Sequence, residues 1–308
     1  MSYLIFILSS MTVLIALATL LHLQFGLTGI VNFGVAGFWG VGLYVFGILM
    51  VNLGLPFLPA LVVATLVVGV IGFVIGWIVL DLDDQAVLVA TLSFASIGFY
   101  LVTTEKQITK GSVGFGTVPF PFDLGSNTEL AFLITLAIPT ILLVLYAWRI
   151  RSQPYGRLLV GIRDNEGLAR SLGKPTFRQK LVLFTVTSAL MGFFGAMSAG
   201  FHHFLLPSML GPTITFATWI ALTLGGKRHW AGGLVGVVLI TVVFDILVET
   251  YVPLPPDLVA IIPNLKYLLY GVLLMLVIMF RPEGLLGAAT PRHPKATQAT
   301  AKAGQPNA

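Results

Sequence analysis

The sequence predicts an all-α protein, a polytopic integral membrane helical bundle with about nine transmembrane segments, in a range of roughly eight to ten. First, 57% of the 308 residues are hydrophobic, and the mean hydropathy is +0.97. Second, only 9% of the residues are charged, whereas soluble domains carry about 25%. Third, many apolar stretches reach the roughly 20 residues that a helix needs to cross a bilayer. The chain has no cysteine, which excludes a disulfide framework and a thiolate metal site.

The apolar segments follow one another along the whole chain. The first, "MSYLIFILSSMTVLIALATLLHL", lacks the basic start and small-residue cleavage site of a secretory signal, so we expect an uncleaved span. The seventh is short and follows Pro207 and Pro212, which favours a broken or re-entrant element. Irregular backbone at membrane depth requires surrounding protein or a cavity. The expected spans are 3–23, 27–51, 56–80, 86–104, 129–149, 181–200, 212–226, 231–251 and 261–280.

Lysine and arginine gather in three regions, which the positive-inside rule places in the cytoplasm. Eight of them lie between the fifth and sixth spans, Lys227 and Arg228 follow the seventh span, and a third group lies in the tail. This assignment places the 105–128 loop, residues 252–260 and the N-terminus outside. The eight are Arg149, Arg151, Arg157, Arg163, Arg170, Lys174, Arg178 and Lys180.

The same charges define the expected domain organisation. Residues 1–286 should form one transmembrane domain with a cytoplasmic loop at 150–180. Residues 287–308, rich in Ala, Thr, Pro and Lys without an apolar period, should form a disordered basic cytoplasmic tail. The formal net charge of +5 then indicates which loops face the cytoplasmic side of the membrane. We expect lipid rather than nucleic acid around this protein.

The cytoplasmic stretch "YGRLLVGIRDNEGLARSLGK" (155–174) has the periodicity of one helix or of two short ones. Glycine at position 173, followed by Lys174-Pro175, predicts a helix stop. Its residues alone leave two interpretations open: a helix resting on anionic headgroups, or a helix that docks on a protein partner. The expected apolar stripe is Leu158, Ile162, Asn165, Ala169 and Leu172, and the opposite face is Arg163, Glu166 and Arg170, with Glu166 and Arg170 as an i,i+4 pair.

Two patterns that could indicate a catalytic site do not have the spacing and residue types that such a site requires. "GLARSLGKPT" looks like a phosphate-binding loop, but the glycines are one residue too far apart and Pro175 replaces the hydroxyl that binds magnesium. The pair His202-His203 has no H-E-x-x-H spacing and no carboxylate neighbours. We therefore predict no ATPase in this chain, no metal site, no catalytic residue and no enzymatic activity.

The second span contains many glycines and one amide, Asn32 between Gly29 and Gly34. Small residues let helices pack closely, whereas unwound backbone beside an amide can present N–H groups to a carboxylate substrate. Both interpretations stay open. Asp245 and Glu249 are intramembrane polar residues of the eighth span, and such groups are functional candidates by default. Asp245 lies deeper in the span, so it is the better candidate for a polar contact between helices or for a residue of the transport pathway.

Six blocks of this sequence resemble, in the same order, the M-type permease subunit of branched-chain amino acid ABC importers. Each block alone is weak, but their order and the fitting loop lengths make the resemblance specific. It extends from residue 25 or so to residue 287. The blocks are "GIVNFGVAGFWGVGLY" (29–44), "VLVATLSFASI" (87–97), "ITKGSVGF" (108–115), "YGRLLVGIRDNEGLARSLG" (155–173), "LTLGGKRHWAGGLVG" (222–236) and "RPEGLLG" (281–287).

The resemblance implies a permease subunit of an ATP-driven importer in the bacterial cytoplasmic (inner) membrane, with branched-chain amino acids as the expected substrate. The implied partners are a second related permease, two cytoplasmic ATPases and an external substrate-binding protein. This chain would bind no cofactor, because the partner subunits use the ATP. Relatives that carry urea or short amides leave the substrate open, and the rival from another class is an ion-coupled secondary transporter that uses Asp245 and Glu249.

The resemblance also implies roles for two groups of residues. One group couples the permease to the ATPases, and the other lines the path of the substrate. The expected coupling residues are Arg163, Asn165, Glu166, Ala169, Arg170 and Gly173. The expected path residues are Gly29, Asn32, Gly34, Phe38, Tyr44 and Thr91.

Overall fold

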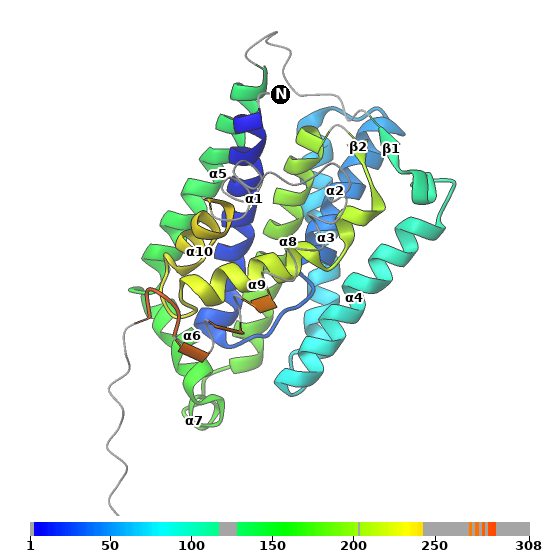
Figure 1. Cartoon of the computed structure of the whole chain (residues 1–308). Helices are drawn as coiled ribbons and strands as arrows, with labels where there is room; N and C mark the ends of the chain where they lie inside the picture. The colour runs from blue at the N-terminus through cyan, green and yellow to red at the C-terminus, as the bar shows by residue number, and fades with distance from the viewer. Residues whose placement is uncertain are drawn as a thin grey trace, which may run out of the picture.

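The computed structural model describes residues 3–116, 128–202, 204–242, 271–272, 275–276, 279–280 and 283–287, and these form a helical bundle (Figure 1). The predicted all-α membrane fold is confirmed. The α-helices are α1 (Tyr3–Leu21), α2 (Val35–Val51), α3 (Phe57–Val79), α4 (Asp84–Thr104), α5 (Thr128–Ile150), α6 (Pro154–Asp164), α7 (Glu166–Ser171), α8 (Thr176–His202), α9 (Thr213–Gly225) and α10 (Gly232–Ile240). The shorter elements are the π-helix η1 (His22–Gly26), the 3-10 helices η2 (Gly111–Val113) and η4 (Pro207–Leu210), and the strands β1 (Phe115–Gly116) and β2 (Phe204–Leu205), which pair antiparallel.

The first seven expected spans each correspond to a described helix. Among the described residues, six helical segments are long and apolar enough to cross a membrane, and α2 is a shorter apolar helix. The seventh span is broken as predicted, because η4 precedes α9 and the two are separated at Gly211 and Pro212. The eighth span is described only as far as residue 242 and contains α10. Three parts of the sequence analysis lie outside the described residues: most of the span 261–280, the pair Asp245 and Glu249, and the tail from residue 288 onward.

The two ends of the bundle carry different elements. The N-terminus and the paired strands β1 and β2 lie at one end, and α6 and α7 lie at the other (Figure 1). This arrangement agrees with the sidedness predicted from lysine and arginine, in which the 155–174 stretch is cytoplasmic. We refer to the α6 and α7 end, which the sequence predicts to face the cytoplasm, as the cytoplasmic end.

The centre of the bundle is α8, which packs closely against α2 and α3. Glycines permit this approach: a Cβ atom on Gly42 would lie 2.1 Å from the carbonyl oxygen of Gly192. A Cβ atom on Gly195 would lie 1.9 Å from the carbonyl oxygen of Trp39. The glycines in the helical part of the second span therefore serve helix packing.

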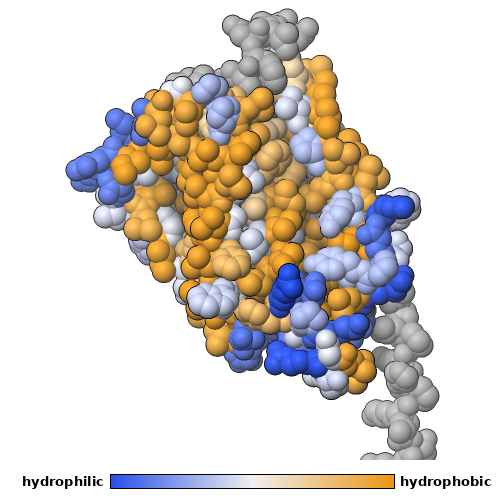
Figure 2. All heavy atoms as spheres, turned by 180° about the vertical axis from the view of Figure 1, so that it is seen from behind, coloured by the Kyte–Doolittle hydropathy of each residue, from blue (hydrophilic) through white to orange (hydrophobic). Residues whose placement is uncertain are grey.

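The outer surface is apolar over most of its height. Large hydrophobic side chains of α3, α4 and α5 are exposed, including Leu66 at 63% and Leu142 at 61%. Figure 2 shows this apolar surface as a broad belt, with hydrophilic residues gathered toward the ends. Such a belt suits a hydrocarbon environment or neighbouring membrane subunits.

The segment 283–287 closes the cytoplasmic end of α9. The N–H groups of Leu285 and Leu286 donate to the carbonyls of Leu224 and Gly225 at 2.8 and 2.9 Å. These carbonyls belong to the last turn of α9, which lacks donors of its own. Two of the sequence blocks, 222–236 and 281–287, therefore meet at one place in the fold.

Candidate functional site

The second span begins with an unwound segment, residues 29–34, before α2 starts at Val35. The backbone at Gly29 has φ +79°, a left-handed conformation that a residue with a Cβ atom adopts only with strain. One of the two interpretations that the sequence left open included an unwound backbone beside an amide, and residues 29–34 have this backbone. At about 1.5 Å per residue the helical part spans only about 25 Å, so residues 29–34 complete the crossing on the cytoplasmic side.

The side chain of Asn32 is fully buried and satisfied within the protein. Its Nδ2 donates to Gln24 Oε1 at 2.8 Å, and its Oδ1 accepts from the Gly34 N–H at 2.7 Å. Gln24 in turn donates from Nε2 to the Thr187 hydroxyl on α8 at 2.7 Å. In this conformation the amide holds the unwound segment in shape, and both of its polar atoms already have partners.

Three further hydrogen bonds tie this part of the chain to α4 and α9. The Phe33 N–H donates to Thr91 Oγ1 on α4 at 3.0 Å. The indole N–H of Trp219 on α9 donates to the Asn32 carbonyl at 3.0 Å, and the Ala36 N–H donates to Thr215 Oγ1 at 2.9 Å. The unwound segment and the first turn of α2 are thus hydrogen-bonded to two helices, α4 and α9, that are distant in sequence.

The predicted path residues divide into two groups. Gly29, Asn32, Gly34 and Thr91 come together around the unwound segment: a Cβ atom on Gly34 would lie 2.9 Å from the Thr91 carbonyl oxygen. Phe38 and Tyr44, the other two residues that the resemblance assigned to the path, are buried along α2. The ring of Phe38 packs between Phe94 and Phe184, and the hydroxyl of Tyr44 lies 3.4 Å from the Leu205 carbonyl oxygen.

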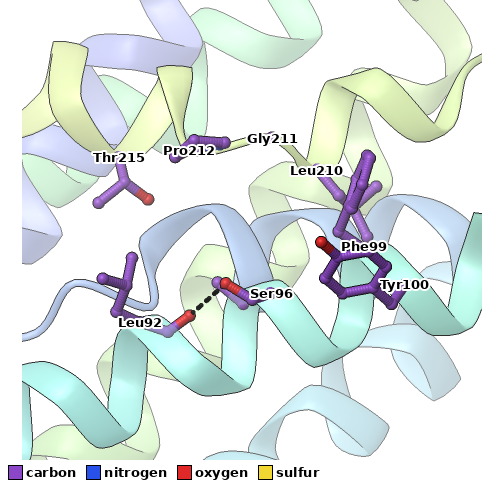
Figure 3. Close-up of a pocket in the computed structure, with 9 residues that line it drawn as sticks. Leu92, Ser96, Phe99, Tyr100, Leu210, Gly211, Pro212 and Thr215 are labelled. Atoms are coloured by element: carbon purple, nitrogen blue, oxygen red, sulfur yellow. Dashed lines mark hydrogen bonds between the residues drawn. The ribbon is translucent and has the colours of Figure 1, made fainter.

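A pocket of about 220 Å³ lies between α4 and the break that joins η4 to α9 (Figure 3). Its walls are mainly apolar, with hydroxyl groups from Ser96, Tyr100 and Thr215. The Ser96 hydroxyl donates to the Leu92 carbonyl at 3.1 Å. The sequence indicated only the break at Pro212. The pocket is lined by Leu92, Ala95, Ser96, Phe99, Tyr100, Leu210, Gly211, Pro212 and Thr215.

The cytoplasmic stretch 155–174 forms two helices that meet at Asn165. Its backbone there is extended (φ −158°, ψ 95°), and its side-chain oxygen accepts from the Leu168 N–H at 2.9 Å as the N-cap of α7. Because of this break, α6 and α7 do not share one helical register. The apolar stripe expected from the sequence is therefore wrong at its C-terminal end. Ile162 and Ala169 are buried, but Leu172 is 70% exposed.

Ion pairs hold α7 against the start of α8. Glu166 pairs with Arg170 at 3.1 Å, which confirms the predicted i,i+4 pair, and also with Lys180 of α8. Burial alone would raise the pKa of the Glu166 carboxyl, but the hydrogen bond and charge of Lys180, helped by Thr176 and Arg170, hold this pKa below its ordinary value. Gly173 has φ +75° and ends the helical region as predicted.

Two exposed apolar side chains lie at α7, Leu168 within the helix and Leu172 directly after it, and the sequence did not place either among the coupling residues. Leu168 is 57% exposed and Leu172 is 70% exposed, at the cytoplasmic end of the molecule (Figure 1). Exposed apolar residues on a charged cytoplasmic segment indicate a contact surface. The sequence did contain a signal for this exposure, the helix-capping residue Asn165. A new helix that starts at Asn165 has its own register, and in that register both leucines lie on the exposed side.

Arg163 does not share a face with Glu166 and Arg170, in contrast to the sequence expectation. It lies at the end of α6, before the break, and its guanidinium donates to the Gly26 carbonyl and, at 2.8 and 3.0 Å, to Asp164. Its side chain is 20% exposed, against 62% for Arg170. The extended backbone at Asn165 separates the two arginines into different environments.

The ring of His202, one of the histidine pair, packs edge-on against Trp39 with the ring centres 6.3 Å apart. His203 lies outside the described residues. Within the parts of the chain that the structure describes, no group of three or more His, Cys, Asp or Glu side chains is placed to hold a metal ion.

Comparison with known proteins identifies a family for this chain. The family model described as "Branched-chain amino acid transport system / permease component" matches residues 3–278. The permease protein LivM of the high-affinity branched-chain amino acid transport system of Salmonella typhimurium is 28% identical, over 88% of this chain and 67% of its own length, and so is LivM of Escherichia coli. The probable branched-chain amino acid transport permease LivH of Methanocaldococcus jannaschii is 26% identical, over 91% of this chain and 89% of its own length. No solved structure matches significantly.

Proposed function

The chain belongs to the family of branched-chain amino acid transport permease components, and we propose that it is the membrane-spanning subunit of an ATP-driven importer of branched-chain amino acids. The match over residues 3–278 carries this proposal. The fold supports it, because six described helical segments are long and apolar enough to span a membrane. The organisms of the bacterial relatives support the cytoplasmic membrane as its location.

The proposed contact with the ATPases is α7. Leu168 and Leu172 offer apolar surface, and the ion pairs of Glu166 with Arg170 and Lys180 fix the direction of the helix. A preoriented helix loses little conformational entropy when it enters a groove of a partner. The chain's own glycine-lysine stretch does not fit a nucleotide site, so ATP would be used by the partner subunits and not by this chain.

The proposed membrane partner is a second, related permease. The chain is similar to both a LivM and a LivH protein of one organism, Methanocaldococcus jannaschii, which supports two subunits built on one plan. The exposed apolar faces of α3, α4 and α5 provide surface for such a partner or for lipid. An external binding protein would meet the opposite end, where β1 and β2 pair.

The pocket between α4 and α9 has apolar walls that suit a branched aliphatic side chain. Urea has no aliphatic side chain to bury against them, and burial of apolar surface is a favourable contribution to binding. The walls formed by Leu92, Phe99 and Leu210 are apolar, which suits a leucine-like substrate. The volume of about 220 Å³ is large enough for one such side chain.

The test is reconstitution. The chain is co-expressed with the four partner subunits from its own genome and placed in proteoliposomes, and uptake of radiolabelled leucine and of urea is measured with and without ATP. We expect leucine uptake that requires ATP and the binding protein. Uptake that follows a proton or sodium gradient without the ATPases would overturn the proposal in favour of an ion-coupled transporter.

A further inference from the structure

The end of α6 contacts the membrane domain where its unwound segment begins. The Arg163 guanidinium donates to the Gly26 carbonyl, one of the last carbonyls of the first span, where intrahelical donors run out. The aliphatic part of Arg163 lies over Gly29: a Cβ atom there would be 3.2 Å from Arg163 Cγ. Position 29 therefore carries glycine both for its φ of +79° and for the room that Arg163 takes.

The guanidinium is oriented by its neighbour. Its Nε and Nη2 donate to the same carboxylate oxygen of Asp164 at 3.0 and 2.8 Å, which leaves Nη1 for Gly26. A lysine ammonium is a single point charge and cannot repeat this planar arrangement of donors. Arg163 and Asp164 line a polar pocket with Asp84, Lys227 and Arg228, so the group lies at the polar cytoplasmic boundary of the bundle.

Hydrogen bonds connect the unwound segment that follows Gly26 and Gly29 to the helices around the proposed substrate pocket. The unwound segment is bound to Thr91 of α4 and to Trp219 of α9, and the next turn is bound to Thr215 of α9. Thr215 itself lines the pocket between α4 and α9. A displacement of Gly26 and Gly29 therefore acts on both walls of that pocket.

We propose that Arg163 is a positioning residue that transmits movement of the coupling segment to the unwound segment and so to the α4–α9 pocket, and that it is not a residue the ATPase grips. This inference rests on the proposed function and sharpens it. It reassigns Arg163 from the docking surface, where the sequence placed it with Glu166 and Arg170. The geometry separates the two roles at Asn165, because docking residues follow it and the transmitting residue precedes it.

The test compares Arg163→Met and Arg163→Lys with the matched control Arg157→Met, in the complete reconstituted complex. Arg157 lies on the same helix and is exposed, and among the bonds of the described residues its side chain donates only to the Ser152 carbonyl, at 2.7 Å. Three quantities are measured: ATPase subunits co-purified per permease, ATP hydrolysis stimulated by the loaded binding protein, and leucine uptake. Monodispersity in size-exclusion chromatography confirms that each variant is folded.

We expect both Arg163 variants to retain ATPase at the wild-type ratio and to lose uptake by about tenfold or more, since a charged hydrogen bond is removed. ATP hydrolysed per leucine transported should rise, and Arg157→Met should match the wild type. Loss of ATPase binding in the Arg163 variants, or normal coupling in both, would overturn the inference. A wild-type complex that binds no ATPase would instead refute the proposed function itself.

Discussion

The two helices of the coupling segment differ in where they direct their side chains. The helix α6 buries Leu159 and Ile162 and turns Arg163 toward the unwound segment. The helix α7 buries Ala169 but exposes Leu168, and Leu172, the residue directly after the helix, is exposed as well. Both belong to one basic stretch in the sequence, and only the extended backbone at Asn165 separates them.

One cytoplasmic loop can therefore combine an anchor, α6, with a docking surface, α7. A rigid link between them is needed if force applied to α7 is to reach α6. Asn165 supplies this link, because its side chain caps α7 while its own N–H donates to the Gly161 carbonyl of α6 at 3.1 Å. The following predictions test whether the two helices are as distinct as the structure indicates.

The largest effect is expected from Glu166→Lys. The change places a third cation beside Lys180 and Arg170, and Lys180, whose side chain is only 15% exposed, loses its partner. Breaking a partly buried pair from one side is strongly destabilising, so α7 should leave its position. ATPase co-purification should be lost, while membrane insertion and the contacts of α6 are retained. Co-purification at the wild-type ratio would contradict the role of α7.

A strong effect is expected from Gly173→Leu. Nothing lies within 4 Å of a Cβ atom at this position, so the effect comes from the backbone, whose φ is +75°. An L-residue in this conformation is destabilised by roughly 1–2 kcal/mol, which should reduce ATPase co-purification several-fold.

The matched control for position 173 is Gly161→Leu. This glycine in α6 also has open space around it but lies within a helix, where leucine is the better residue. Co-purification should be normal in the control. An equal loss in both variants would show that bulk at the cytoplasmic surface, and not the left-handed backbone, is responsible.

An intermediate effect is expected from Asn165→Ala. The substitution removes the side-chain cap on the Leu168 N–H, which is worth about 1 kcal/mol. Hydrogen exchange should therefore accelerate in α7 and remain unchanged in α6 before Asn165. If protection falls equally in both helices, they form one cooperative unit and the comparison fails.

The smallest effect concerns pH. The pKa of Glu166 is lowered in the folded protein, so its ion pairs contribute stability that is present above the unfolded pKa. That contribution is lost as the pH falls through the lower, folded pKa. Hydrogen exchange of α7, corrected for intrinsic rates, should show reduced protection in that acidic window. Glu166→Gln should remove this pH dependence, and its persistence in that variant would assign it to another group.

Much of this fold could be predicted from the sequence because lipid imposes a simple requirement on it. A helix must be about 20 apolar residues long to cross, so the limits of spans such as 129–149 agree closely with α5. Local signals also worked: Gly173 ends the helical region, and Glu166 pairs with Arg170. The break before α9 followed from Pro212.

The remaining features depend on contacts between distant parts of the chain. One periodic stripe fitted either one helix or two, so the reset at Asn165 and the exposure of Leu172 were missed. Nothing local reveals that Arg163 meets Gly26, or that Leu92 and Leu210 border one pocket. The proposed roles of Asp245 and Glu249 stay predictions, because these residues lie outside the described part of the chain.

The most direct test of the central claim is a distance measured between α4 and α9 while the ATPases act. The chain contains no cysteine, so spin labels on this subunit attach only at engineered positions. Ile97 and Phe216, 57% and 46% exposed, are suitable on the two helices. We predict that ATP changes the Ile97–Phe216 label distance in the assembled complex, and that Arg163→Met abolishes the change while the ATPases stay bound. An unaltered ATP-driven change in Arg163→Met would contradict it.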